Sequence, residues 1–146
     1  MTVRAVVDTN VIVSGLLSPR GPPGDLLLGA GSLYELIWTA ALIVECRQVL
    51  GRPRIARRLG RQASVAEAAL SRLVKLASVV ESDRLPTGRI VPEDPDDDVL
   101  FGTALAGGAR FIVTGDAAVL RVGQFAGIQV VTMAEFLALL GSGPGG

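Results

Sequence analysis

Residues 3–17, VRAVVDTNVIVSGLL, begin with an apolar run that leads directly into the carboxylate of Asp8. The run has the length and β-branching of a strand that is buried on both faces. Val11, Ile12 and Leu16 then recur at the spacing of a helix. A strand, a turn and a helix begin an α/β unit, and open parallel sheets bind ligands at the carboxyl ends of their strands. Asp8 is therefore a candidate site residue, although an Asp or Asn at this place also often caps the next helix.

Strand and helix patterns alternate along the rest of the chain. Strand-like segments cover residues 33–38, the region around Val79, residues 110–113 and residues 128–131, and helical segments cover residues 25–30, 40–50, 63–80, 97–106 and 134–140. Residues 18–24, SPRGPPG, predict a turn. This alternation is typical of an α/β domain with a parallel sheet. We expect one domain over residues 1–140 and a flexible tail, GSGPGG, over residues 141–146.

Composition excludes several classes of function. The 146 residues contain one Cys and no His, and Lys+Arg and Asp+Glu both number 14. Without histidine there is no Ser-His-Asp or Cys-His catalysis and no HExxH zinc site. The usual glycine-rich phosphate loops are also missing. No apolar stretch approaches the roughly 18 residues of a membrane-spanning helix, so we expect a soluble, cytoplasmic protein without membrane contact. Any catalysis must be carried by carboxylates.

Acidic residues recur at positions that suit a shared site. Glu45 falls at the edge of the apolar arc of helix 40–50. Taken alone it is a surface Glu whose stem leans on the core, as is usual for such acids, and a half-buried carboxylate that contributes to a site is the alternative. Residues 93–98, EDPDDD, open another helix, and Asp116 ends the strand 110–113 as Asp8 ends the first strand. Such acids can meet at one edge of a parallel sheet. Oxygen ligands without nitrogen or sulfur favour Mg²⁺ or Mn²⁺.

Six arginines lie within residues 47–61, and no acid interrupts the sequence between Glu45 and Glu67. A run of one sign is typical of a surface that contacts phosphates or an acidic partner, although an ordinary solvated helix face is the alternative. We expect contacts to RNA or to a partner from the following four residues: Arg52, Arg54, Arg57 and Arg58.

Several phrases resemble the PIN-domain nucleases, and specifically the toxins of bacterial and archaeal toxin–antitoxin pairs. VVDTNVIVSGLLSPRG is similar to the opening motif, LIVECRQVL followed by RPRIARRL to the second, and DPDDDVLFGTALAGGARFIVTGD to the third and fourth. The resemblance implies that Asp8, Glu45, Asp98 and Asp116 are the catalytic acids and metal ligands, with Asn10 as an amide that orients the site. Asp97 is the alternative third acid, because helical spacing also brings it toward the core.

The resemblance implies a Rossmann-like, three-layer α/β/α fold with a mainly parallel five-stranded sheet. It also implies a Mg²⁺- or Mn²⁺-dependent endoribonuclease that hydrolyses RNA, forms a homodimer or higher homo-oligomer and is inhibited by a cognate antitoxin protein. Two alternatives stay open. One is a noncatalytic interaction protein with the PIN fold. The other is a receiver-like phospho-acceptor domain, which is disfavoured because Lys75, the only lysine, falls within a helical pattern and not at a strand end.

Overall fold

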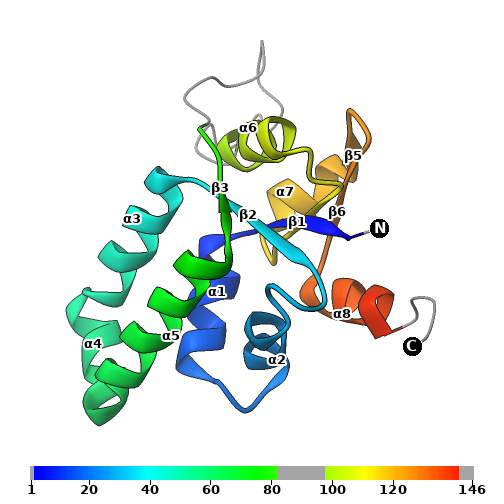
Figure 1. The fold of residues 1–146 in the computed structure, drawn as a ribbon. Coiled ribbons are helices and arrows are strands. Elements are labelled where there is room, and N and C mark those ends of the chain that lie inside the picture. The colour runs from blue at the N-terminus through cyan, green and yellow to red at the C-terminus, as the bar shows by residue number, and fades with distance from the viewer. Residues whose placement is uncertain (1, 82–97, 142–146) are drawn as a thin grey trace.

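The computed structural model describes residues 2–81 and 98–141, which fold around one six-stranded sheet (Figure 1). The strands are β1 (Arg4–Val7), β2 (Glu35–Trp38), β3 (Ser78–Val79), β4 (Phe111–Val113), β5 (Gln124–Phe125) and β6 (Ile128–Val131). Their order is β3-β2-β1-β4-β6-β5, and all neighbours are parallel except β5 with β6. The mainly parallel α/β sheet is confirmed, but the predicted number of five strands is wrong by one.

The additional strand is β5, which pairs antiparallel with β6 through the turn Ala126–Gly127. Two residues are too few to show an alternation of apolar and polar side chains, so the sequence pattern does not reveal this strand. Both turn residues have positive φ, 51° at Ala126 and 83° at Gly127. Positive φ at both central residues is what a two-residue type I′ hairpin requires. Ala126 is the only described residue other than glycine with this backbone conformation.

Eight α-helices and one 3₁₀ turn surround the sheet in the part of the chain that the structure describes. In chain order they are α1 (Thr9–Leu17), α2 (Pro22–Leu28), α3 (Ala40–Leu50), α4 (Pro53–Leu59), the 3₁₀ turn η1 (Gly60–Gln62), α5 (Ala63–Leu76), α6 (Asp98–Gly107), α7 (Ala117–Val122) and α8 (Met133–Gly141). The short helices α4 and α7 were not predicted. Among these described helices, none is both long and apolar enough to cross a membrane.

Two helix boundaries differ from the sequence prediction for clear reasons. The predicted turn over residues 18–24 ends earlier, because α2 begins at Pro22. Proline is tolerated in the first turn of a helix, where its missing N–H would have no helical partner. The predicted helix over residues 63–80 ends at Leu76, and the chain enters β3 at Ser78. The Thr39 cap of α3 is present, since its Oγ1 accepts a hydrogen bond from Leu42 N at 3.2 Å.

Helices cover both faces of the sheet and form three layers. Successive β1 side chains alternate between the faces, with Ala5 and Val7 in one core and Val6 in the other. The first core contains apolar side chains from α1, α2, α3, α5 and α8, and the second contains those of α6 and α7. The predicted tail lies outside the described residues except for Gly141, the last residue of α8.

The β5–β6 turn gives a prediction of stability. Ala126→Asn should raise the free energy of unfolding by about 0.5–1 kcal/mol, because asparagine tolerates the left-handed conformation that alanine adopts at a cost. Thermal and urea unfolding would measure the change. The matched control is Ala68→Asn, at an exposed position within α5. It should lower stability by about 0.5 kcal/mol through helix propensity. A destabilised Ala126→Asn protein would contradict this interpretation of the turn.

Candidate active site

Asp8 lies at the junction of β1 and α1, at the carboxyl edge of the sheet. Its backbone N–H donates to Val113 O at 2.9 Å, which extends the β1–β4 pairing beyond the strand ends. Its carbonyl accepts from Val11 N and Ile12 N at 3.0 and 3.1 Å and so begins α1. Although Asp8 is the N-cap residue, its side chain makes no capping hydrogen bond. The carboxylate is thus available for another role.

Thr114 connects Asp8 with the second strand-end acid. The threonine is buried, with 1% of its surface exposed. Its Oγ1 donates to Asp8 Oδ2 at 2.7 Å and accepts from Asp116 N at 3.1 Å. Asp116 in turn caps α7, because its Oδ1 accepts from Ala118 N at 2.8 Å. One hydroxyl group therefore fixes the positions of both acids at the ends of β1 and β4.

The two acids open into a cavity of about 550 Å³ at this edge of the sheet. The loop after β4 and the first turns of α1 and α8 form much of its wall. The lining residues are Asp8, Asn10, Val11, Ser14, Pro23, Thr114, Gly115, Asp116, Thr132, Met133 and Ala134. Its polar side chains are carboxylates, hydroxyls and one amide, with no basic group among these lining residues. This chemistry suits a cation with oxygen ligands.

The environment of Asp8 in the cavity disfavours the ionised form of its carboxyl group. Burial raises the pKa of the Asp8 carboxyl above its ordinary value, and the negative charge of Asp116 raises it further. The hydrogen bond from Thr114 and the nearby amides of Asn10 and Thr9 oppose this rise without cancelling it. The ionised Asp8 is therefore unfavourable in the metal-free protein, and a bound cation would relieve that cost.

Glu45 is linked to this region through α1, and it is exposed on α3. The surface placement is confirmed, and the half-buried alternative is wrong. Thr9, which is buried, donates from Oγ1 to Glu45 Oε2 at 3.1 Å. Burial, together with the charges of Glu45 and Asp8, raises the pKa of the Cys46 thiol to about 12. Both acids thus act on one buried thiol, which itself has no tendency to ionise at neutral pH.

Asp98 is placed differently from the other acids. It is the first residue of α6 and is buried, with 2% of its surface exposed, but it is not among the residues that line the cavity. Asp97 lies outside the described residues, as does the rest of the acidic run before it. The choice between Asp97 and Asp98 as the third acid therefore stays a prediction.

The described acids provide two carboxylate ligands for a magnesium ion in one cavity, but not three. Across residues 2–81 and 98–141 there is no group of three or more acidic or cysteine side chains that could hold a metal ion. Asp8 and Asp116 nevertheless supply two carboxylates beside hydroxyl oxygens in one cavity. Mg²⁺ keeps several waters and commonly takes only one or two protein carboxylates, with substrate phosphates as further ligands. This donor set fits such an ion.

Thr114 is the residue that sequence reasoning missed. The signal was a threonine two positions before Asp116, since Ser and Thr hydroxyls often bond the amide two residues on. The second bond, to Asp8, depends on the β1–β4 pairing and leaves no local pattern in the sequence. The reciprocal capping box of Thr132 and Glu135 at the start of α8 was missed as well, although the helix itself was predicted within one residue of its observed start.

The predicted contact arginines lie on a separate part of the surface. Arg52 precedes α4, whereas Arg54, Arg57 and Arg58 lie on α4, and all four are exposed. None of them lines the Asp8 cavity. In Figure 1, α4 lies at the far end of the α3–α4–α5 group, away from β1. The structure therefore keeps the four arginines apart from the cavity that contains Asp8 and Asp116.

Comparisons with known proteins agree with this architecture. No curated protein matches the chain. The crystal structure of PAE2754 from Pyrobaculum aerophilum is similar in fold, with a TM-score of 0.60 and 18% sequence identity over 98% of this chain and 100% of that one. A family model described as PIN domain matches residues 4–118, which include β1, β4, Asp8 and Asp116. Because that match covers most of the sequence, the chain belongs to the PIN domain family.

Proposed function

We propose that the protein is a metal-dependent endoribonuclease that hydrolyses RNA phosphodiester bonds with Mg²⁺ or Mn²⁺. PIN domains are usually metal-dependent nucleases, and this chain belongs to that family. The observation that carries the proposal is the arrangement of Asp8 and Asp116 about the Thr114 hydroxyl in an oxygen-lined cavity. Because the sequence has no histidine, acid–base catalysis by imidazole is excluded.

Each proposed residue has a defined role. Asp8 and Asp116 would hold the ion, and the proposal takes Glu45, which accepts a hydrogen bond from Thr9, and Asp98 as the further acids. The exposed Asn10 amide, which lines the cavity, would orient the substrate phosphate. Such an ion, when bound, activates water and stabilises the leaving oxygen. Thr114 would keep the Asp8 carboxylate and the Asp116 backbone in place before substrate arrives.

The proposal includes the cellular context that the sequence resemblance implies. The enzyme would be the cytoplasmic toxin of a toxin–antitoxin pair, active as a homodimer or higher oligomer and inhibited by its antitoxin. A noncatalytic PIN-fold interaction protein is the alternative, and the absence or presence of turnover separates the two. The receiver-like alternative lacks its required lysine at a strand end, because Lys75 is exposed within α5.

The first prediction concerns activity. The protein should cleave single-stranded RNA in Mg²⁺ or Mn²⁺, and EDTA should abolish the cleavage because the acids alone cannot activate water. Asp8→Asn and Asp116→Asn should each lower the single-turnover rate by at least about 100-fold, on the scale of removing one electrostatic interaction with the transition state. Gel analysis of end-labelled RNA would measure this. Cleavage that resists chelation, or that needs zinc, would contradict the proposal.

The second prediction separates a metal site from a structural role of Asp8. In EDTA at pH 7, Asp8→Asn should raise the melting temperature by a few degrees, because it removes a carboxylate whose pKa burial holds above the unfolded value. A raised folded pKa means that the ionised group destabilises the fold at neutral pH. This gain should therefore shrink as the pH falls toward the unfolded pKa of the carboxyl, where Asp8 is protonated in both states.

The same two proteins should differ in their response to metal. Added Mn²⁺ should stabilise the unaltered protein by mass action and should stabilise Asp8→Asn much less. Thermal unfolding with and without Mn²⁺ would measure both effects, and Asp25→Asn, at an exposed position in the first turn of α2, is the control that should gain no stability in EDTA and should respond to Mn²⁺ as the parent does. Equal melting temperatures of the parent and Asp8→Asn throughout, with RNA cleavage retained, would exclude Asp8 from the metal site.

The third prediction concerns the arginines at α4. Replacing all four of Arg52, Arg54, Arg57 and Arg58 with Ala should weaken RNA binding and flatten its salt dependence, by about 0.7 in log–log slope for each phosphate that the protein ceases to neutralise. Fluorescence anisotropy over a range of KCl concentrations would measure both. Arg110→Ala, at an exposed position outside α4, should leave the slope unchanged. If the affinities for RNA and for an acidic partner and their salt dependence are all unchanged, these arginines are only a solvent-exposed helix face.

A further inference from the structure

The hydroxyl group of Thr9 links α1 to α3 next to the cavity that contains Asp8 and Asp116 (the acidic cavity). Thr9 is the first residue of α1 and is buried, with 3% of its surface exposed. Its Oγ1 donates to Glu45 Oε2 at 3.1 Å. Thr9 itself is not among the residues that line the acidic cavity. Any effect of its hydroxyl on the site therefore acts through the group that it binds.

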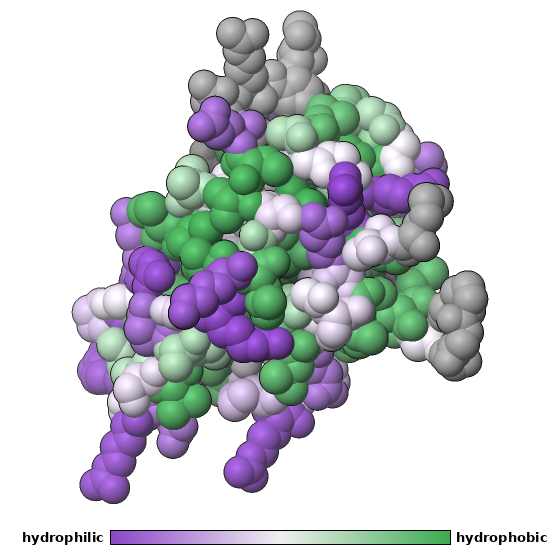
Figure 2. All heavy atoms as spheres, viewed as in Figure 1, coloured by the Kyte–Doolittle hydropathy of each residue, from purple (hydrophilic) through white to green (hydrophobic). Residues whose placement is uncertain are grey.

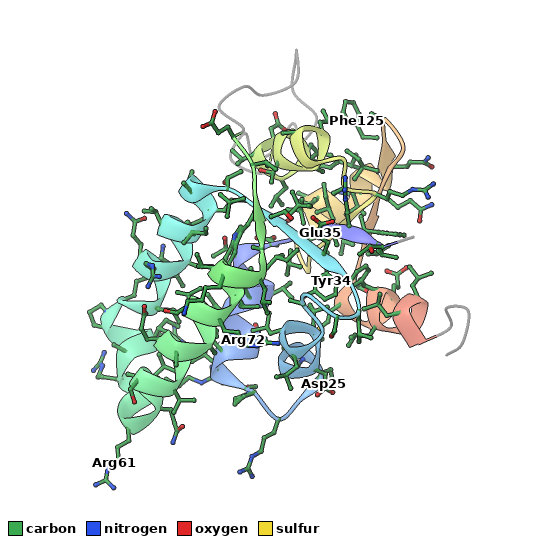
Figure 3. The ribbon with its side chains drawn as sticks, in the orientation of Figure 1. Asp25, Tyr34, Glu35, Arg61, Arg72 and Phe125 are labelled. Carbon is green, nitrogen blue, oxygen red and sulfur yellow. The ribbon has the colours of Figure 1, made fainter. Side chains whose placement is uncertain are left out.

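Within residues 2–81 and 98–141, this is the one hydrogen bond or ion pair of the Glu45 side chain. Basic residues of the neighbouring helices have other partners or point elsewhere. Arg47, on α3, pairs with Glu67 of α5. Arg72 reaches from α5 to backbone carbonyls at the end of α2, whereas Arg61 extends away from the helices (Figure 3). The position of the Glu45 carboxylate thus depends on Thr9.

An exposed glutamate such as Glu45 does not need a protein partner. Figure 2 shows hydrophilic side chains among hydrophobic ones on the outer surface over α3, α4 and α5, where water would satisfy a carboxylate. Ordering a long side chain costs conformational entropy. A hydrogen bond from a hydroxyl to a charged carboxylate is stronger than a neutral one and can offset that cost. The Thr9 bond therefore selects one position of Glu45 from those that water allows.

The selected position brings Glu45 toward Asp8. Thr9 follows Asp8 directly in the chain, so the hydroxyl that holds Glu45 belongs to the same strand–helix junction as the Asp8 carboxylate. The neighbouring Cys46 thiol gives a second indication. Burial is the main cause of its raised pKa, and the charges of Glu45 and Asp8 both add to the rise. Since such interactions weaken with distance, both carboxylates lie near the same buried sulfur.

We propose that Thr9 is a positioning residue, which holds Glu45 in place as a ligand of the metal ion in the acidic cavity. This inference rests on the proposed nuclease function, because it concerns the same metal site. Thr114 links Asp8 to the Asp116 backbone across β1 and β4. Thr9 adds the link from α1 to Glu45 on α3. A carboxylate that is already ordered loses less freedom when the ion binds, so the bond raises metal affinity.

The alternative is a structural role, in which Thr9 only joins α1 to α3. The test compares Thr9→Val, which keeps the shape of the side chain and removes the hydroxyl, with Thr9→Ser, which keeps the hydroxyl. The matched control is Thr103→Val, because Thr103 is also a buried helical threonine and donates from Oγ1 to Val99 O at 2.8 Å, outside the lining of the acidic cavity. Thermal unfolding in EDTA would establish that each variant is folded. If Thr9→Val does not fold, Thr9→Ala replaces it.

Mn²⁺ affinity of the full chain would be measured from the electron paramagnetic resonance signal of the free ion, and single-turnover RNA cleavage would be followed in parallel. Thr9→Val should weaken Mn²⁺ binding at least about 10-fold, the lower end of the range for residues that orient metal ligands, and should slow cleavage. Thr9→Ser should restore most of both, and Thr103→Val should stay within twofold of the parent. Glu45→Ala should weaken Mn²⁺ binding at least as much as Thr9→Val.

The double variant shows whether Thr9 acts through Glu45. Adding Thr9→Val to Glu45→Ala should have no further effect on Mn²⁺ affinity, because the carboxylate that Thr9 positions is gone. Independent, additive effects would overturn the inference, and so would a Thr9→Val protein that loses stability in EDTA but binds Mn²⁺ as the parent does. Either result leaves the nuclease function intact if the parent binds Mn²⁺ and cleaves RNA. A parent that binds no Mn²⁺ would contradict the proposed function itself, and this inference with it.

Discussion

The parallel pairing of β1 with β4 is the constraint on which the candidate site depends. It places the carboxyl ends of two buried strands side by side, and the bond from Asp8 N to Val113 O continues the pairing for one more residue. Only in this register does the Thr114 hydroxyl reach Asp8 Oδ2 while it also holds the Asp116 amide. A shift of one residue would turn these side chains to the opposite face of the sheet. The sheet register thus determines the geometry of the acids.

That geometry carries a cost in stability which the fold offsets only in part. Burial raises the pKa of Asp8, and Asp116 nearby adds repulsion, so the acids are held together against their mutual charge. The Thr114 hydrogen bond and the nearby amides reduce this cost. An acid that only caps a helix would not have to be held in such an unfavourable environment. Asp116 differs from Asp8 in this respect, since one of its carboxylate oxygens does cap α7. An acid that remains unfavourable and makes no cap bond is typical of a functional position.

Sequence reasoning predicted those parts of the fold that long apolar patterns determine. The strands around Val7, Ile37, Ile112 and Val130 were found, because apolar periodicity is a local signal. The two-residue β5 and the six-residue α7 were missed, since they are too brief to show a period, and α4 was missed because its seven residues, PRIARRL, include three arginines and few large apolar side chains. In the site, strand ends predicted Asp8 and Asp116, whereas the exposure of Glu45 depended on how α3 rotates against its neighbours. The Thr114 bond joins residues 106 positions apart, which no local pattern records.

The helices α1 and α2 pack closely against each other, and their residues line two cavities of opposite character. A Cβ on Gly24 would lie 2.1 Å from Pro19 O, and one on Gly15 would lie 2.5 Å from Leu27 Cδ1, so that the approach of the two segments requires glycine at both positions. On one side of α1 and α2 lies the acidic cavity, and on the other lies a second, apolar cavity of about 530 Å³ that is edged by Arg20, Arg58 and Arg72. Because both glycines line the second cavity and their neighbours Ser14 and Pro23 line the first, a larger residue at either glycine would displace backbone common to both surfaces. The separation of the acidic cavity from the arginine-edged cavity in this small domain therefore depends on the absence of two side chains, and not only on the charged groups themselves.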